Sequence, residues 1–145
     1  MTVPTCVFVY GTLMPGERNS AVAGVYRRAE AARLPDHLLL DLRPEGYPAL
    51  VARPGAEPVH GVLLHYTPEE WASVCPQLDR LEGTDETPPL YRRVQVQVET
   101  DAGMRQAWVY LYARPERMRQ PGCTPLPTGC WTAAPDRFTP EPGQP

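Results

Sequence analysis

The sequence predicts an α+β domain built on a closed or nearly closed β-sheet. The chain has 145 residues, close to the ~150 expected of a single domain. Runs with strand character outnumber runs with helical character, and few segments are long enough to be crossover helices. We therefore expect one domain over residues 1–134, followed by a proline-rich flexible tail over residues 135–145.

Strands are predicted in the first half of the chain where short apolar runs end in glycine or proline turns. The first run is Thr5–Tyr10, which ends at Gly11 as a buried strand would. After it, Asn19–Arg28 is compatible with a short helix, although Gly24 lowers its helical propensity. Three further strands are expected at Leu38–Leu40, Tyr47–Ala52 and Val59–Tyr66.

A helix is predicted to begin after Thr67. Thr67 and Glu70 have the spacing of a capping box, and Pro68 suits the first helical position. Pro76 predicts a kink, or a second short helix that begins there. Apolar residues recur at helical spacing, at Trp71, Val74, Leu78 and Leu81.

The second half of the chain predicts a β-hairpin followed by irregular chain. Val94–Val98 alternates apolar and polar residues, Asp101–Gly103 forms a turn, and Ala107–Tyr112 forms the returning strand. Eight of the 31 residues after Arg114 are prolines, so we expect no regular structure from Pro115 onward.

Composition excludes several classes of function. The net charge is −3 and the arginines are scattered, which argues against nucleic acid as a partner. All 14 basic residues are arginines, and without lysine there is no Schiff base, no pyridoxal phosphate attachment and no P-loop. The only serines, Ser20 and Ser73, do not lie in a nucleophile-elbow motif. No basic leader and no run of about 18 apolar residues occur, so we expect a cytoplasmic protein without membrane contact.

The cysteines and histidines predict neither a metal site nor a cofactor. The four cysteines form no C-x-x-C pair and do not cluster with histidines. Cys6 and Cys75 lie in apolar runs, where buried free thiols are common, whereas Cys123 and Cys130 can be either bridged or reduced. His60 and His65 face opposite sides of one strand and are expected to be structural.

Two segments are candidates for a binding and catalytic site. Gly11 lets the chain bend sharply, so the amides of the Tyr10–Leu13 turn can bind carboxylate or phosphate oxygens; the same turn can also be an ordinary strand exit. Glu82 follows Leu78 by four residues and projects beside the apolar helix face, where lost hydration would raise the pKa of its carboxyl toward that of a general acid/base. Alternatively, Glu82 reaches solvent at the end of the helix, before Gly83.

Other polar and aromatic residues surround these candidates in the sequence. Asp79 is expected to pair with Arg80, Arg92 or Arg93. A set of strand aromatics gives either a pocket wall with hydrogen-bonding tips or simply barrel core: Tyr91, Trp108, Tyr110 and Tyr112.

Taken in order, these segments resemble the γ-glutamylcyclotransferase-like superfamily, which includes γ-glutamylamine cyclotransferases. The resemblance covers Thr5–Trp131, most of the chain. One departure is Gly129-Cys130-Trp131, where the family usually has Gly-Asp-Trp. The matching segments are Val7–Leu13, Tyr47–Val51, Gly61–Leu63, Leu78–Gly83, Tyr91–Val94, Ala107–Tyr110 and Pro127–Trp131.

The resemblance implies a small mixed β-barrel flanked by two or so helices, with a pocket at one end. It implies that Glu82 is the catalytic acid/base and that Tyr91 and Tyr110 are aromatic pocket residues. The substrate carboxylate would be held by backbone amides of the turn Tyr10, Gly11, Thr12 and Leu13. It implies no metal and no cofactor, and a small-molecule γ-glutamyl substrate. Separately, we expect a monomer or weak dimer.

The implied reaction is an intramolecular cyclisation that releases 5-oxoproline and an amine. The alternative is a non-catalytic small-ligand binding or interaction module on the same barrel. A Glu82 side chain inside a cavity with the Tyr10–Leu13 turn would favour the enzyme, and one in bulk water would favour the module. A third hypothesis is a hydrolase using Cys6 with His60 or His65, for which the sequence shows no orienting group.

Overall fold

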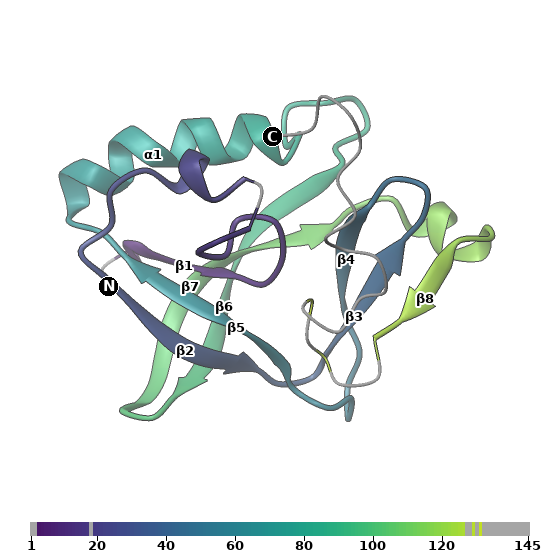
Figure 1. The fold of residues 1–145 in the computed structure, drawn as a ribbon, viewed down its shortest axis with the longest axis horizontal. Helices are drawn as coiled ribbons and strands as arrows, with labels where there is room; N and C mark the ends of the chain where they lie inside the picture. Colours follow the sequence, from purple (N-terminus) through teal and green to yellow (C-terminus); the bar gives the residue numbers. More distant parts are fainter. Residues whose placement is uncertain (1–2, 18, 127–128, 130, 132–145) are drawn as a thin grey trace.

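The fold consists of a closed barrel and a smaller sheet (Figure 1). The structure is a computed structural model and describes residues 3–17, 19–126, 129 and 131. Five strands close the barrel in the order β1-β5-β2-β6-β7, with β1 parallel to β7 and the other pairs antiparallel. The α+β fold on a small mixed barrel is therefore confirmed. The barrel strands are β1 (Cys6–Val9), β2 (Arg28–Leu34), β5 (Val59–His65), β6 (Tyr91–Thr100) and β7 (Gly103–Tyr112).

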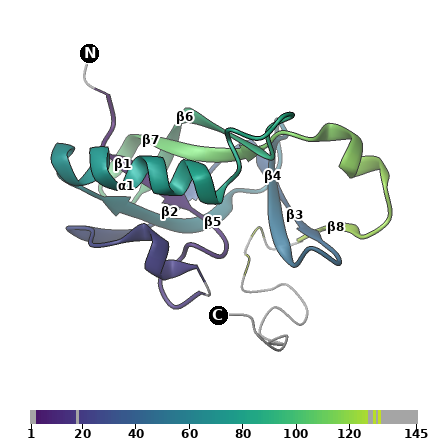
Figure 2. The same cartoon turned by 90° about the horizontal axis from the view of Figure 1, so that it is seen from above.

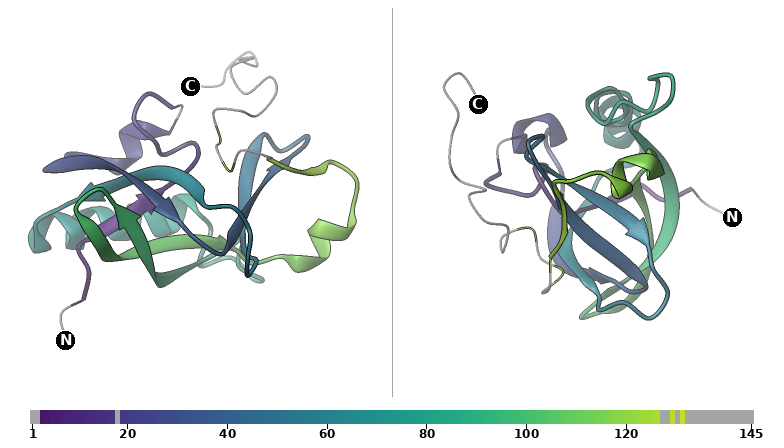
Figure 3. Two further views of the ribbon diagram at one scale, coloured as in Figure 1. Left: turned by 90° about the horizontal axis from the view of Figure 1, so that it is seen from below. Right: turned by 90° about the vertical axis from the view of Figure 1, so that its right-hand side faces the viewer.

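The smaller sheet stands beside one end of the barrel (Figure 3). Its strand order is β4-β3-β8, from β3 (His37–Leu42), β4 (Tyr47–Ala52) and β8 (Cys123–Pro125). Gly11 meets Pro48 of this sheet so closely that a Cβ on Gly11 would lie 2.5 Å from Pro48 Cγ. The Tyr91 hydroxyl of the barrel also donates a hydrogen bond to the Pro48 carbonyl. The end of the barrel and the small sheet thus meet at Pro48.

Helix α1 (Pro68–Leu81) runs along the barrel (Figure 2). The capping box is confirmed: the Glu70 amide donates to Thr67 Oγ1 at 3.1 Å, and the Thr67 amide donates to Glu70 Oε1 at 2.9 Å. The buried residues of α1 are Trp71, Val74 and Leu78.

Helix α1 is continuous through Pro76, so the predicted restart as a second short helix is wrong, whereas the kink stays a prediction. Pro76 is exposed, and its ring removes only one helical hydrogen bond. Because Val74 and Leu78 on either side are packed into the core, burial of the helix face outweighs that loss.

Three segments differ from the sequence prediction. The helix expected over Asn19–Arg28 is reduced to a 3-10 turn, Ser20–Ala23, and the chain enters β2 at Arg28. Strand β2 was not predicted, because its sequence has no apolar alternation; it forms by pairing with β5 along its whole length.

The prediction of no regular structure after Pro115 is also wrong. A 3-10 helix spans Pro115–Arg119, and β8 pairs with β3 at the edge of the small sheet, where a proline's missing donor is tolerated. The predicted hairpin is confirmed as the longer strands β6 and β7. The tail prediction and Cys130 lie outside the described residues. Within the described part of the chain, no helix is long and apolar enough to span a membrane.

Candidate active site

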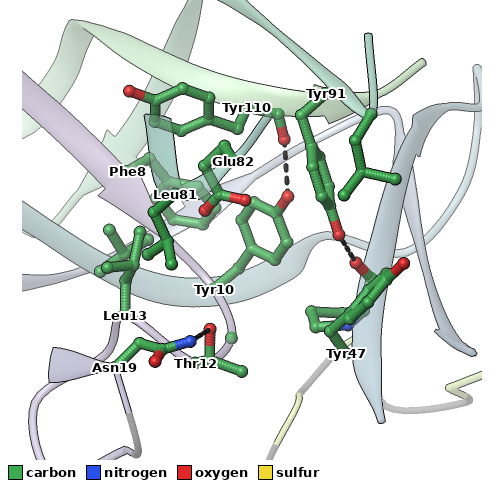
Figure 4. A pocket seen from close by; sticks show the side chains of 14 residues that line it. Phe8, Tyr10, Thr12, Leu13, Asn19, Tyr47, Leu81, Glu82, Tyr91 and Tyr110 are labelled. Atoms are coloured by element: carbon green, nitrogen blue, oxygen red, sulfur yellow. Dashed lines mark hydrogen bonds between the residues drawn. The ribbon is translucent and has the colours of Figure 1, made fainter. Parts of the chain in front are cut away.

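A cavity of about 170 Å³ lies where the end of the barrel, the end of α1 and the small sheet meet (Figure 4). The residues that the family resemblance assigned to the site all line it: Tyr10, Gly11, Thr12, Leu13, Glu82, Tyr91 and Tyr110. The structure thus brings together residues that lie up to 100 positions apart. The lining residues that the sequence did not indicate are Phe8, Val9, Asn19, Tyr47, Pro48, Leu81 and Leu90.

The turn after β1 is held open by its own hydrogen bonds. The Met14 amide donates to the Gly11 carbonyl at 3.0 Å, and Asn19 Nδ2 donates to Thr12 Oγ1 at 3.0 Å. Among the residues that the structure describes, none accepts a hydrogen bond from the backbone amides of Gly11, Thr12 or Leu13. The turn therefore has donors to offer an oxyanion. The sequence did not indicate Asn19 as a site residue, because its side chain acts through a contact with Thr12, seven residues earlier in the chain.

Glu82 is the last residue held by α1. Its amide donates to the Leu78 carbonyl at 2.9 Å, and Gly83, with φ of +68°, ends the helix as predicted. The carboxyl points into the cavity (Figure 4). Burial raises the pKa of Glu82 from its ordinary value of 4.5 to about 7. The carboxyl can therefore both take up and release a proton near neutral pH.

Three phenols brace the cavity wall. Tyr10 donates its hydroxyl proton to the Tyr110 carbonyl at 2.6 Å, and Tyr91 donates to the Pro48 carbonyl. The Tyr110 hydroxyl donates to Asp79 Oδ1 at 2.7 Å, directed away from the cavity. Burial raises the pKa of all three phenols, so they stay neutral. Their rings line the cavity while their protons are committed to protein acceptors.

The other residues predicted near the site lie around it. Of the three candidate arginines, Arg93 pairs with Asp79, with Nε 2.9 Å from Oδ1. Trp108 does not line the cavity; its indole donates to the Pro4 carbonyl at 2.8 Å. Tyr112 packs edge-on against the Tyr91 ring outside the cavity.

Among the residues that the structure describes, the cysteines and histidines do not form a nucleophilic site. The Cys6 thiol donates to the Gln106 carbonyl at 3.2 Å, and burial raises its pKa to about 11, so it is not a thiolate at neutral pH. His65 contacts Glu30 at 2.8 Å, and Cys75 and Cys123 are free. The described residues contain no group of three or more His, Cys, Asp or Glu side chains arranged to hold a metal ion.

Known proteins share this fold. A family model described as "Gamma-glutamyl cyclotransferase, AIG2-like" matches residues 7–133, whereas a comparison with curated proteins found no match. Among solved structures, YkqA from Bacillus subtilis is similar with a TM-score of 0.67 and 21% identity, over 97% of this chain and 44% of YkqA. An AIG2-like protein from Mus musculus has a TM-score of 0.59 and 21% identity, over 81% of this chain and 84% of the mouse protein.

A third solved structure extends the comparison. PH0828 from Pyrococcus horikoshii is similar with a TM-score of 0.59 and 17% identity, over 93% of this chain and 92% of PH0828. The chain therefore spans less than half the length of YkqA but nearly all of PH0828. These TM-scores show a shared fold. The family model extends from β1 past β8, and so the chain belongs to the AIG2-like gamma-glutamyl cyclotransferase family.

Proposed function

We propose that this protein is a γ-glutamyl cyclotransferase that converts a small γ-glutamyl compound into 5-oxoproline and a free amine. One observation carries the proposal: Glu82, with a pKa near 7, lines the same small cavity as the open amides of Gly11, Thr12 and Leu13. Membership of the family supports the same class of reaction.

The proposed reaction needs one acid/base. The Glu82 carboxylate takes a proton from the substrate α-ammonium, and the resulting amine attacks the γ-amide carbonyl carbon of its own molecule. A new C–N bond closes the five-membered lactam, and the carbonyl oxygen carries negative charge until the bond to the leaving nitrogen breaks. Glu82 gives its proton to that nitrogen as the bond breaks, then takes the second proton from the ring nitrogen and passes it to the freed amine. The products are a neutral lactam and an ammonium, and the carboxylate is regenerated. Turnover by this route rises as the pH passes through about 7, because the carboxylate form starts the reaction.

The turn and the cavity walls would supply binding and orientation. Amides of Gly11, Thr12 and Leu13 can hold the substrate carboxylate in a concavity of backbone donors. The cavity of about 170 Å³ is smaller than the roughly 300–1,000 Å³ of pockets for drug-sized ligands, which suits a small substrate. A glutamyl unit confined there is folded, so that its amine and its γ-carbonyl lie close together, and this proximity lowers the barrier to ring closure.

The geometry favours this function over a non-catalytic binding module. A module needs a cavity but has no use for a carboxyl with a pKa near 7, and maintaining one costs stability. The position of Glu82 inside the cavity is the feature that separates the two hypotheses.

The test is to incubate the purified chain with a panel of γ-glutamyl amines and peptides and to measure 5-oxoproline. At least one compound should be turned over, and Glu82→Gln should lower its turnover by about 10²–10⁴-fold. Glu69→Gln is the matched control, since Glu69 is exposed at the start of the same helix and should leave turnover unchanged.

Two outcomes would contradict the proposal. Wild-type turnover in Glu82→Gln would remove Glu82 from the mechanism. Thermal stabilisation by 5-oxoproline without turnover of any compound would support the binding module instead.

A further inference from the structure

Asp79 lies one helical turn before Glu82 and joins α1 to two strands of the barrel. Its Oδ1 accepts a hydrogen bond from the Tyr110 hydroxyl of β7 at 2.7 Å and one from Arg93 Nε of β6 at 2.9 Å. Its Oδ2 accepts a longer bond from Arg93 at 3.4 Å. A single side chain thus holds the last turn of α1 against two neighbouring strands.

The partners of Asp79 are themselves fixed. The Arg93 guanidinium lies over the Trp108 ring, 4.3 Å from its centroid, and the Trp108 indole is bonded to the Pro4 carbonyl. Tyr110 lines the cavity with its ring, and its carbonyl accepts the Tyr10 hydroxyl. Asp79 is therefore bonded to a braced part of the wall that faces Glu82.

The backbone of Asp79 closes the end of the helix. Its carbonyl accepts hydrogen bonds from the amide of Thr84 at 3.1 Å and from Thr84 Oγ1 at 3.2 Å. Glu82 lies inside the loop that these bonds close, so its backbone position depends on where Asp79 is held.

We propose that Asp79 is a positioning residue that fixes the last turn of α1 on β6 and β7 and thereby keeps the Glu82 carboxyl inside the cavity. The catalytic consequence rests on the proposed function, but the effect on Glu82 itself can be measured without a substrate. Nothing in the catalytic scheme above uses Asp79, and it does not line the cavity.

The charges around Glu82 indicate how Asp79 acts. Burial is the cause of the raised pKa of Glu82, and the negative charge of Asp79 is paired with Arg93. The titratable groups of the barrel that face Glu82 are Tyr10 and Tyr91, which stay neutral. Releasing Asp79 would therefore lower the pKa of Glu82 chiefly by letting water reach its carboxyl.

A matched pair of variants separates position from charge. Asp79→Asn and Asp79→Ala remove the same charge, but Asn keeps an oxygen for the Tyr110 hydroxyl. Tyr110→Phe removes that hydroxyl while it leaves every charge and the cavity-lining ring in place. Asp85→Ala is the control, because Asp85 is exposed in the loop after Glu82.

The experiment is a carboxyl ¹³C NMR titration of Glu82 in these full-length variants, with kcat and KM measured on any accepted substrate. We expect the Glu82 pKa to fall by about one unit more in Asp79→Ala than in Asp79→Asn, and to fall in Tyr110→Phe as well. Asp85→Ala should match the wild type. In Asp79→Ala, kcat should fall on the order of 10²-fold with little change in KM, since misplacement of a catalytic group impairs the chemical step.

The outcomes distinguish this inference from the proposed function. If the Glu82 pKa is the same in the wild type, Asp79→Ala and Tyr110→Phe, the positioning role of Asp79 is overturned, even if the variants lose stability. If Asp79→Ala does not fold, Tyr110→Phe by itself tests the inference. A Glu82 pKa in Tyr110→Phe equal to that of the wild type would then contradict the positioning role of Asp79. A lowered pKa in a protein that releases no 5-oxoproline would support positioning and reject the enzyme.

Discussion

At the scale of single residues, the Glu82 carboxyl costs the folded protein stability. Its pKa is about 7 when folded and near 4.5 when unfolded, so between these pH values the folded state binds more protons than the unfolded state. The contribution of Glu82 to the free energy of unfolding is therefore greatest below about pH 4.5, and it is lost as the pH rises to about 7. Under the proposed function, Glu82 would therefore destabilise the folded protein most at the pH where it acts as a base.

Glu82→Gln should relieve this cost. The unfolding free energy of the variant minus that of the wild type should increase by about 2 to 3 kcal/mol as the pH is raised from 5 to 8, because glutamine does not ionise. Denaturant unfolding of both proteins at the two pH values measures the difference, and contributions of other titrating groups cancel. Glu69→Gln should show no such pH-dependent gain, and a flat difference for Glu82→Gln would mean that its carboxyl is hydrated.

Single-residue patterns predicted part of the site. Helical spacing placed Glu82 beside the apolar face of α1, and charge complementarity gave Arg93 among the partners of Asp79. The acceptors of Tyr10 and Tyr91 could not be predicted, because each is a backbone carbonyl on a distant strand. Barrel closure sets the contact of Tyr10, and the meeting of the barrel with the small sheet sets that of Tyr91, so neither contact has a local sequence pattern.

At the scale of elements, the two ends of α1 have separate roles. The capping box at Thr67 satisfies amides at the start of the helix, whereas Asp79 and Glu82 lie at its end. Stability and chemistry should therefore respond to different substitutions within one helix.

Thr67→Ala should lower stability without altering turnover. Removing an N-cap hydroxyl costs about 1 kcal/mol, and the substitution is about four turns from the cavity in a helix held along its length by Trp71 and Val74. Denaturant unfolding and 5-oxoproline release, each at 25 °C, measure the two effects. Ser73→Ala is the matched control on the exposed face and should change neither. A loss of turnover in Thr67→Ala would show that the two helix ends are coupled.

Elements with a strong local signal were predicted, and those that depend on pairing were not. The capping box predicted the start of α1, and alternation predicted the β6–β7 hairpin. Strand β2 has alanines and charges without alternation, and β8 contains a proline. Both are strands because β5 and β3 offer them a complete hydrogen-bonding partner.

At the scale of the whole molecule, the cavity exists because two sheets meet. Pro48 belongs to the small sheet, yet it packs on Gly11 of the turn and accepts the Tyr91 hydroxyl of the barrel. The sequence predicted the strands but not this junction, since β4 and the barrel strands are joined by no ladder. Contacts such as those of Pro48 with Gly11 and Tyr91, and not a strand ladder, bring the small sheet to the cavity.

Tyr91→Phe should loosen that junction. The ring remains, but the buried carbonyl of Pro48 loses its donor, and an unsatisfied buried acceptor costs about 1 to 3 kcal/mol. Tyr26→Phe is the matched control: the Tyr26 hydroxyl has no hydrogen bond to any residue that the structure describes, so its removal should change stability by less than about 0.5 kcal/mol. Denaturant unfolding of the two variants tests this. If both match the wild type, the small sheet is held on the barrel by packing around Gly11, and the phenol of Tyr91 contributes only its ring.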